Sequence, residues 1–493
     1  MTKASVARGA MALGITRIAT NLANLIALVV LARLLTPQDF GLVAICTTVL
    51  GILTTITELS LGSALIQRAE VSRDHIDTAW TLSFLRALVI AVGFALTALP
   101  LSWLYGDARL APLFVVTGAT GALGSLSSPF IAMRTRTMSF RPMIAMQVVQ
   151  KLSGLGISIA LALWLQNYWA IIVGTAIGTA LSTVMSYIII PYLPHFTLAR
   201  SRDLLGFSSW LFLGQVVNVL NWRFDQLIIG LFLPPSHLGA YSMADNISAI
   251  PSRETTTPLV QALFPSFARM QGDKARLRAA YLTAEGTVGL IALPVGFGLM
   301  LLAEPLVQVT LGAKWMMAVP LIKVISCSYA VQTLVTGSRP LAMAQGATRA
   351  LFLRDVGGLA LRVPFVIVGL MGWGITGLVW GRLLSSVIGL FITAGLVRTI
   401  IGLPISEQVW AHRRTVVAVA VMTVLVPLAD HELLRFGAGP VLRIGLLAPL
   451  GAVSFFGSLH VLWRASGRCA GAESELLGLA RAALSKRGVL SKV

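Results

Sequence analysis

Charged residues are scarce in this 493-residue chain, and acidic ones are the scarcest: there are 19 Asp and Glu against 38 Lys and Arg. Charged residues together make up 12% of the sequence, whereas 56% of it is hydrophobic. A soluble protein of this length would lie far outside the usual range at that composition. We therefore expect lipid, and not water, to be the main solvent of this chain.

Cysteine is nearly absent, and the common motifs of catalysis are missing. Cys46 and Cys327 lie in apolar runs and Cys469 lies near the C-terminus, which predicts neither a disulfide framework nor a redox role. The sequence has no Walker motif, no zinc-ligand spacing and no nucleophile elbow, and its six His residues are scattered. We predict no catalytic residue, metal or cofactor, and the chain is not expected to be an enzyme.

Long uncharged runs recur along the whole chain. A membrane-spanning helix takes about 20 apolar residues, because its backbone must satisfy its own hydrogen bonds in lipid. The fold class predicted is an all-α polytopic membrane protein with about 14 transmembrane helices, twelve being the alternative. The candidate spans are 10–34, 41–61, 79–105, 110–133, 143–165, 168–192, 206–233, 240–264, 283–303, 318–345, 352–371, 374–397, 413–429 and 440–463.

The basic residues alternate between the loops that these spans define. If the N-terminus lies inside, most Lys and Arg residues outside the spans fall on the cytoplasmic face, and the opposite face holds Arg109, Lys314, Arg435 and Arg443. By the positive-inside rule, both termini are expected in the cytoplasm. A net charge of +19 distributed in this way argues against nucleic acid as a partner.

An internal repeat relates the two halves of the chain. At an offset of 198 residues, "LLTPQDFGL" (34–42) aligns with "FLPPSHLGA" (232–240), so that Pro37 pairs with Pro235 and Gly41 with Gly239. A chance match of short loops is the alternative, but further matches follow in register. Six spans separate the repeat starts, and an even number keeps the halves parallel.

The repeat predicts the domain organisation. We expect an N-terminal six-helix lobe at 1–199, a C-terminal six-helix lobe at 200–400, two additional transmembrane helices at 401–464 and a cytoplasmic tail at 465–493. The tail is interpreted as an amphipathic helix on anionic membrane lipids or as a disordered segment.

Polar side chains form a stripe on two helices that the repeat relates. Helical spacing puts one set on a single face of span 206–233 and another on a single face of span 10–34. A charged residue at the centre of a membrane helix costs about 2.5 to 3.5 kcal/mol, so both stripes are expected to face a shared cavity. The two sets are Asn218, Asn221 and Asp225, and Arg17, Asn21 and Asn24.

Other ionisable residues accompany these stripes. Arg223 stands two residues before Asp225, and span 240–264 adds Asp245, Arg253 and Glu254. We interpret the arginines and asparagines as candidate substrate contacts, because guanidinium groups pair with pyrophosphate oxygens. Asp225, Asp245 and Glu254 are the candidates for coupling to a proton or sodium ion. Mutual neutralisation in interhelical pairs is the alternative.

Five further charged residues inside spans are interpreted singly as structural, or as reaching toward the membrane interface. Together they still indicate a cationic cavity. They are Glu58, Lys323, Arg339, Arg362 and Arg382.

Four segments show a family resemblance over about residues 1–400: "VLARLLTPQDFGLVA", "LGSALIQR", "QALFPSFARMQGD" and "AEPLVQVTLGAKWMMAVPLI". They resemble the Wzx-type oligosaccharide flippases of the multidrug/oligosaccharidyl-lipid/polysaccharide exporter superfamily. The resemblance implies two six-helix lobes around a cavity, and a bacterial inner-membrane protein that flips undecaprenyl-pyrophosphate-linked repeat units for polysaccharide biosynthesis. These segments mark loops and packing, so the site residues above rest on physical reasoning alone.

Two other functions compete with this interpretation. An exporter of cationic drugs would favour an acidic cavity, whereas Arg and Lys outnumber the acids inside the spans. A membrane polymerase or ligase would need a large periplasmic loop with reactive side chains, and every predicted periplasmic loop is short.

Overall fold

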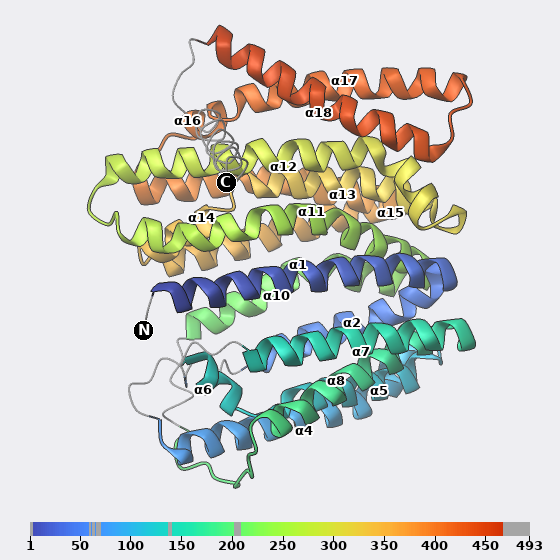
Figure 1. The fold of residues 1–493 in the computed structure, drawn as a ribbon, viewed down its shortest axis with the longest axis vertical. Coiled ribbons are helices and arrows are strands. Elements are labelled where there is room, and N and C mark those ends of the chain that lie inside the picture. The colour runs from blue at the N-terminus through green and yellow to red at the C-terminus, as the bar shows by residue number, and fades with distance from the viewer. Residues whose placement is uncertain are drawn as a thin grey trace, which may run out of the picture. The chain divides into compact units, whose positions relative to one another are not determined.

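The computed structural model describes residues 3–58, 61, 65, 71–136, 141–201 and 209–466. Within these ranges the regular elements are all helices (Figure 1). The first half contains α1 (Lys3–Leu34), α2 (Pro37–Ile56), α4 (Arg73–Leu104), α5 (Leu110–Ser125), α6 (Phe130–Arg136), α7 (Arg141–Leu165), α8 (Trp169–Ile189) and α10 (Ser209–Phe232). The second contains α11 (Pro235–Ala268), α12 (Lys274–Thr310), η1 (Ala313–Trp315), α13 (Ala318–Thr333), α14 (Ser338–Ala344), α15 (Thr348–Ile401), α16 (Ile405–Trp410), α17 (Arg413–Arg435) and α18 (Pro440–Ala465).

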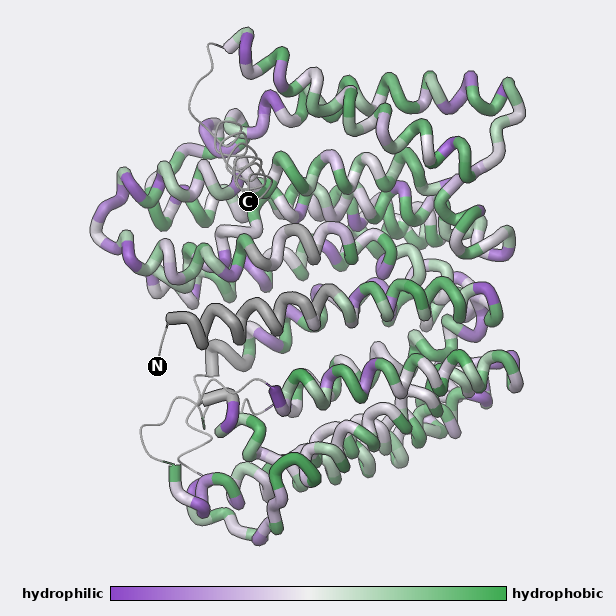
Figure 2. The backbone as a smooth tube through the Cα atoms, viewed as in Figure 1, coloured by the Kyte–Doolittle hydropathy of each residue, from purple (hydrophilic) through white to green (hydrophobic). Residues whose placement is uncertain are grey.

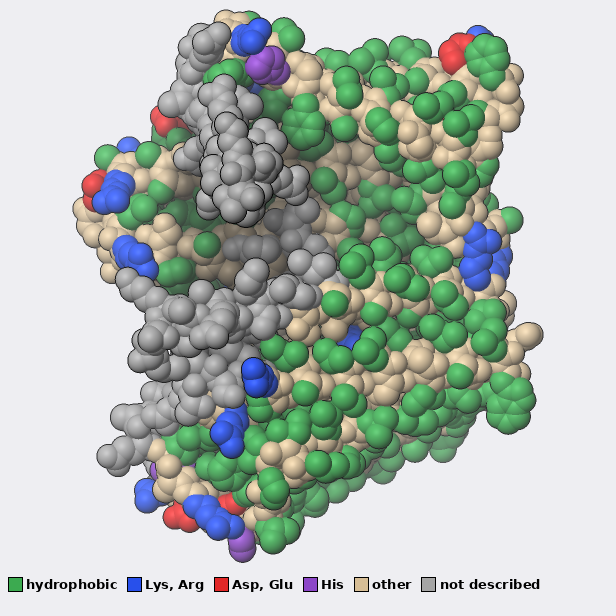
Figure 3. Space-filling model, in the orientation of Figure 1, with side chains coloured by type: hydrophobic (Ala, Val, Ile, Leu, Met, Phe, Trp, Pro, Cys, Tyr) green, Lys and Arg blue, Asp and Glu red, His purple; other side chains and the backbone are tan. Residues whose placement is uncertain are grey.

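Apolar composition explains why these segments are helical and where they sit. In the described part of the chain, nine helices are long and apolar enough to cross a membrane. Figure 2 shows these helices as mostly hydrophobic along their length, with hydrophilic residues gathered toward their ends. The side chains visible in Figure 3 follow the same pattern, with Lys, Arg, Asp and Glu concentrated near helix ends. The prediction of an all-α polytopic membrane protein is confirmed.

The predicted spans all overlap helices, although several boundaries differ. Span 110–133 corresponds to α5 followed by the short α6, and span 318–345 to α13 and α14 with a break between them. Spans 352–371 and 374–397 both lie in α15, whose helical geometry is interrupted at Trp373 and Gly374. Gly374 has φ 61° and ψ −146°, a conformation that favours glycine. The exact number of membrane crossings stays a prediction.

The backbone contacts divide the chain into two compact units, Met1–Gly239 and Ala240–Val493. The first ends just inside α11, and the second holds the rest of that helix and everything after it. The four-part division that the repeat predicts, at 199, 400 and 464, remains a proposal.

Glycines bring the helices of two hairpins into backbone contact. A Cβ on Gly377 would lie 2.1 Å from the carbonyl oxygen of Gly369, so the two halves of α15 touch on either side of the Gly374 turn. In the α7–α8 hairpin, a Cβ on Gly174 would lie 2.8 Å from the carbonyl oxygen of Gly154. Small residues allow such close packing in membranes. The second helix of each hairpin has the same small-residue spacing, given by Gly174, Gly178 and Ser182, and by Gly377, Gly381 and Ser385.

The two loops that define the repeat pack against each other. A Cβ on Gly41 would lie 1.8 Å from the carbonyl oxygen of Pro235, and a Cβ on Gly239 would lie 1.8 Å from that of Pro37. These are the same four residues that the 198-residue offset pairs in sequence. Each glycine thus contacts the repeat equivalent of the proline that precedes it by four residues. Such a reciprocal contact is what two parallel copies produce around a pseudo-two-fold axis.

Candidate functional site

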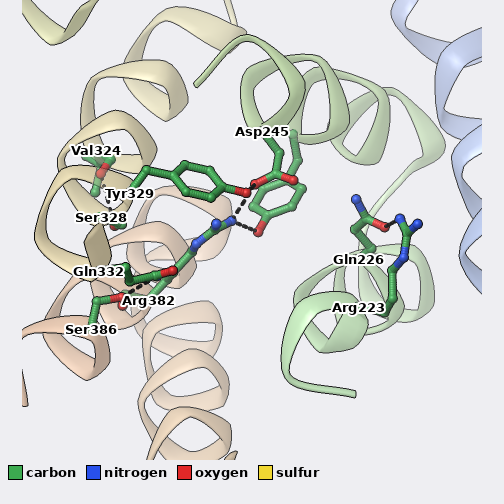
Figure 4. Close-up of polar contacts among 10 residues, drawn as sticks. Arg223, Gln226, Asp245, Val324, Ser328, Tyr329, Gln332, Arg382 and Ser386 are labelled. Atoms are coloured by element: carbon green, nitrogen blue, oxygen red, sulfur yellow. Dashed lines mark hydrogen bonds and ion pairs between the residues drawn. The ribbon is translucent and has the colours of Figure 1, made fainter. Parts of the chain in front are cut away.

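A polar cluster joins α2 and α10 in the first unit. Gln226 is buried on α10, and its Oε1 accepts a hydrogen bond from Thr48 Oγ1 on α2 at 2.7 Å. The same oxygen accepts one from Arg223 Nη1, one turn earlier on α10, at 2.9 Å. Figure 4 shows the side chains of Arg223 and Gln226 lying together on this helix. The amide is therefore held between a hydroxyl and a guanidinium group.

Glycine on α2 makes space for the guanidinium group. A Cβ at Gly51 would lie 3.4 Å from both Nε and Nη2 of Arg223, so any larger side chain there would press on the arginine. Asp225, two residues further along, has an exposed fraction of 0%. Asp225 is therefore fully buried, whereas Arg223 is half-buried against α2.

The start of α2 is held by a second set of polar contacts. Thr36 and Asp39 form a capping box, in which Asp39 Oδ2 accepts from the Thr36 N–H at 2.9 Å. The other carboxylate oxygen accepts from the Tyr168 N–H at 3.1 Å, at the entrance to α8. In a neighbouring loop, Arg109 hydrogen bonds to Asp107 and lowers the pKa of that carboxyl. The contacts of Asp39 orient α2, and so the Thr48 and Gly51 positions of the cluster.

The remaining residues predicted in the first unit lie on α1 and α10. Asn218 and Asn221 are half-buried on α10, and Asn21 and Asn24 are half-buried on α1. The Nδ2 atom of Asn21 is buried without a hydrogen-bond partner in the described part of the chain. Arg17 lies on α1, but its side chain is outside the described residues.

A second polar cluster lies in the second unit, around Arg382 on α15. Its Nη1 donates to Asp245 Oδ1 at 2.8 Å, and it also donates to the hydroxyl of Tyr241, one turn before Asp245 on α11. The same oxygen of Asp245 accepts from the Tyr329 hydroxyl on α13 at 2.9 Å. The guanidinium carbon of Arg382 lies 5.0 Å from the centroid of the Tyr329 ring, within reach of a cation–π interaction. Three helices are thus joined around one partly buried ion pair (Figure 4).

These contacts agree with one of the two interpretations of Arg382, the structural one. Arg382 was interpreted singly as structural or as reaching toward the interface, but its side chain is only 2% exposed. The interface alternative is therefore wrong, because the guanidinium group is held inside the unit by Asp245. One sequence signal was available: Arg382 directly follows Gly381 in the small-residue pattern, so it lies near the face that packs most closely.

Asp245 is the one predicted ion-coupling residue of this unit whose side chain is described. It pairs with Arg382, so the pairing alternative applies to it. Arg253 and Glu254 lie on α11, and their side chains are outside the described residues. Within the described ranges, no group of three or more His, Cys, Asp or Glu side chains could hold a metal ion.

An apolar pocket of about 770 Å³ opens among α12, α17 and α18 in the second unit. Its walls are almost entirely hydrophobic, and His460 and Trp463 lie toward the C-terminal end of α18. The two helices predicted as additions to the repeat, α17 and α18, therefore form part of the wall of this pocket. Representative lining residues are Ile291, Val295, Leu302, Leu447, Ala452 and Phe456.

Comparisons with known proteins agree with this architecture. The model of the polysaccharide biosynthesis protein family matches residues 30–320. The chain is 22% identical over 378 residues to the lipopolysaccharide biosynthesis protein WzxC of Escherichia coli (strain K12), which covers 75% of this chain and 76% of that protein. It is 27% identical over 306 residues to the succinoglycan biosynthesis transport protein ExoT of Rhizobium meliloti (strain 1021), and this alignment covers 62% of this chain and 62% of that protein.

Two solved structures share the fold. The lipid II flippase MurJ, in an inward closed conformation, superposes with a TM-score of 0.74 at 15% identity, over 91% of this chain and 98% of that one. An inward-facing multidrug resistance transporter of the MATE family superposes with a TM-score of 0.60 at 16% identity, over 79% and 98%. At these identities the similarity establishes the fold alone. Since the family model spans more than half of the sequence, the chain belongs to the polysaccharide biosynthesis protein family.

Proposed function

We propose that the protein flips polyprenyl-pyrophosphate-linked oligosaccharide repeat units across the bacterial inner membrane by alternating access. The observation that carries the lipid part of this proposal is the apolar pocket among α12, α17 and α18. Its hydrophobic walls match part of a polyprenyl chain, which is stabilised by burial of each CH₂ group at about 0.8 kcal/mol. Two proteins that the chain resembles are named for lipopolysaccharide biosynthesis and for succinoglycan biosynthesis and transport, which agrees with a role in polysaccharide synthesis.

The charged end of the substrate needs a different environment. Arg223 is our principal candidate for binding the pyrophosphate. Its Nη1 donates to the neutral side-chain amide of Gln226 at 2.9 Å, and its guanidinium group fits beside α2 because position 51 is a glycine. Arg17 and the half-buried asparagines of α1 and α10 are proposed as further substrate contacts in the first unit, and Arg253 is proposed as a substrate contact in the second. Asp225, Asp245 and Glu254 remain the proposed ion-coupling residues, with a proton or sodium as the ion.

The orientation in the membrane is part of the proposal. Most basic residues outside the spans fall on one face, which supports cytoplasmic termini and transport toward the periplasm. The tail at 465–493, proposed to contact anionic lipids, lies outside the described residues, apart from Ala465 and Ser466.

The test is the lipid-linked saccharide pool of a deletion strain, measured by mass spectrometry of lipid extracts. We expect complete repeat units on undecaprenyl pyrophosphate to accumulate while surface polymer is lost, and the wild-type gene to reverse both changes. An unchanged pool together with altered drug efflux would instead indicate a multidrug-type exporter, the class whose fold the chain also shares.

The pocket can be tested separately with a matched pair of variants on α18. Ala452 lines the pocket, so Ala452→Trp should fill it and impair complementation. Val453 is adjacent and 70% exposed, and it is not among the residues that line the pocket, so Val453→Trp should complement normally. Equal activity of the two variants would remove the pocket from the proposal.

A further inference from the structure

A carboxylic acid that the sequence reasoning passed over is buried within α12. Glu285 is 3% exposed and lies in one of the helices apolar enough to cross the membrane. An ionised carboxylate in such a place is costly unless a cation or several hydrogen-bond donors compensate its charge. The partners of Glu285 therefore indicate what form this carboxyl takes.

One carboxyl oxygen contacts a helix break. Gly337 lies between the end of α13 and the start of α14, and its N–H donates to Glu285 Oε1 at 2.7 Å. A Cβ at Gly337 would lie 2.6 Å from the same oxygen, so the contact requires a residue without a side chain. The Glu285 carboxyl on α12 therefore packs directly against the backbone at the break between α13 and α14.

The other carboxyl oxygen is buried and has no hydrogen-bond partner in the described part of the chain. The same holds for the hydroxyl of Tyr281, which is 1% exposed and stands four residues earlier on α12. Residues at this spacing share one helix face. These two groups can pair in either direction: the Tyr281 O–H can donate to an ionised Oε2, or a proton on Oε2 can be donated to the Tyr281 hydroxyl. The second arrangement is favoured if no cation compensates the charge, because a buried neutral acid costs far less than a buried carboxylate.

The nearby cations have other partners. Arg354 on α15 lies 3.3 Å from Asp355 Oδ1, and Arg339 on α14 lies 3.6 Å from the other oxygen of that carboxylate. His412, before α17, packs against Gly289, one turn after Glu285, and burial lowers its pKa to about 4, so it is neutral near pH 7. On α11, the side chains of Arg253 and Glu254 are outside the described residues. Among the described residues, Glu285 forms no ion pair.

We propose that Glu285 is a proton-binding site that couples proton movement to the α13–α14 break. In the state described here Oε2 carries the proton, and during transport the proton passes to water while the electron pair stays on the oxygen. The resulting carboxylate binds N–H donors about twice as strongly as a neutral acid does, which tightens the contact with Gly337. A metal cation fits this site less well than a proton, because the backbone group at Oε1 is a donor. The coupling part of this inference rests on the proposed transport function, whereas the proton site itself does not.

The proton site is tested by infrared difference spectroscopy of the full-length protein in vesicles during a pH titration. We expect an absorption from a protonated carboxyl that is lost at high pH and lost in Glu285→Gln. Asp430→Asn is the matched control, since Asp430 is a carboxyl elsewhere in the second unit that accepts from Arg443 at 2.7 and 2.8 Å. A band that survives in Glu285→Gln, or one that sodium removes at constant pH, would overturn the proposal.

A second variant keeps the proton site testable if Glu285→Gln fails to fold. Tyr281→Phe removes only the acceptor that we assign to the acid O–H, so it should shift the same absorption to higher frequency without abolishing it. An unshifted band would contradict the assignment of that partner.

Coupling is tested in vesicles that contain a pH-sensitive dye and are given lipid extract from the deletion strain. Wild-type protein should move protons when the extract is added, and Glu285→Gln should lose most of that flux while Asp430→Asn keeps it. Undiminished flux in Glu285→Gln would refute the coupling role. If wild-type protein shows no extract-dependent flux while the infrared band is present, the proposed cargo fails but the proton site stands.

Discussion

Replacing Gly41 with alanine should weaken the contact between the two repeat loops. The added Cβ would lie 1.8 Å from the Pro235 carbonyl oxygen and 2.4 Å from its carbonyl carbon. Because real Cβ contacts are essentially never shorter than 3.0 Å, the two backbones must separate by more than 1 Å. No flexible side chain can absorb this shift, so we expect the upper end of the usual overpacking cost, about 3 kcal/mol.

The reciprocal contact supplies a strong check on this reasoning. Gly239→Ala should destabilise by a similar amount, since its Cβ would lie 1.8 Å from the Pro37 carbonyl oxygen. The double variant should cost less than the sum of the two, because the first alanine already separates the segments and the sites share one contact. Full additivity would show that the two glycines act independently.

Stability is best measured by unfolding of the purified protein in mixed detergent micelles with a graded denaturing detergent. Gly389→Ala on α15 is the control, because a Cβ there meets no heavy atom within 4 Å. This control should be neutral or more stable by up to about 1 kcal/mol, since alanine favours a helix. If Gly41→Ala and Gly239→Ala behave like Gly389→Ala, the reciprocal contact does not exist as described.

Three further predictions concern buried or polar groups in the two units. Arg382→Met should cost about 3 kcal/mol, the low end for breaking a buried pair, because it leaves the half-buried Asp245 without its cation. Adding Asp245→Leu should recover part of that loss in the same unfolding assay, and a double variant as unstable as the single one would contradict it. For His412, the pKa is lowered by burial from 6.5 to about 4. The unfolded chain therefore binds more protons between these values, so stability falls as pH drops through that window, by about 3 kcal/mol in total. A comparison of unfolding at about pH 5 and about pH 7.5 should show a smaller loss in His412→Gln than in the wild type. Finally, Arg223→Ala should impair complementation of the deletion strain at normal membrane abundance, whereas Arg435→Ala, at an exposed pair with Glu432, should not. Equal activity of the two variants would remove Arg223 from the site.

The membrane class and the helix positions could be predicted from the sequence because they depend on local composition. An apolar run long enough to cross lipid must satisfy its own backbone, so helix type and approximate bounds follow without knowledge of neighbours. The repeat was also visible, since Pro37, Gly41, Pro235 and Gly239 occur at equal spacing. Even the stripe on α10 followed from helical periodicity, and Asp225 proved to be fully buried.

Only the tertiary structure could decide which of these residues meet. Asp245 and Arg382 are 137 residues apart, and Glu285 and Gly337 are 52 apart, so no periodicity within one helix relates the members of either pair. The sequence accordingly singled out Asp245 without its partner and passed over Glu285. Composition determines that a helix lies in the membrane, because that free energy depends on the residues of the segment itself. Whether a charge is neutralised or left to bind a proton depends on the groups that neighbouring helices bring within hydrogen-bond distance, and packing alone settles that.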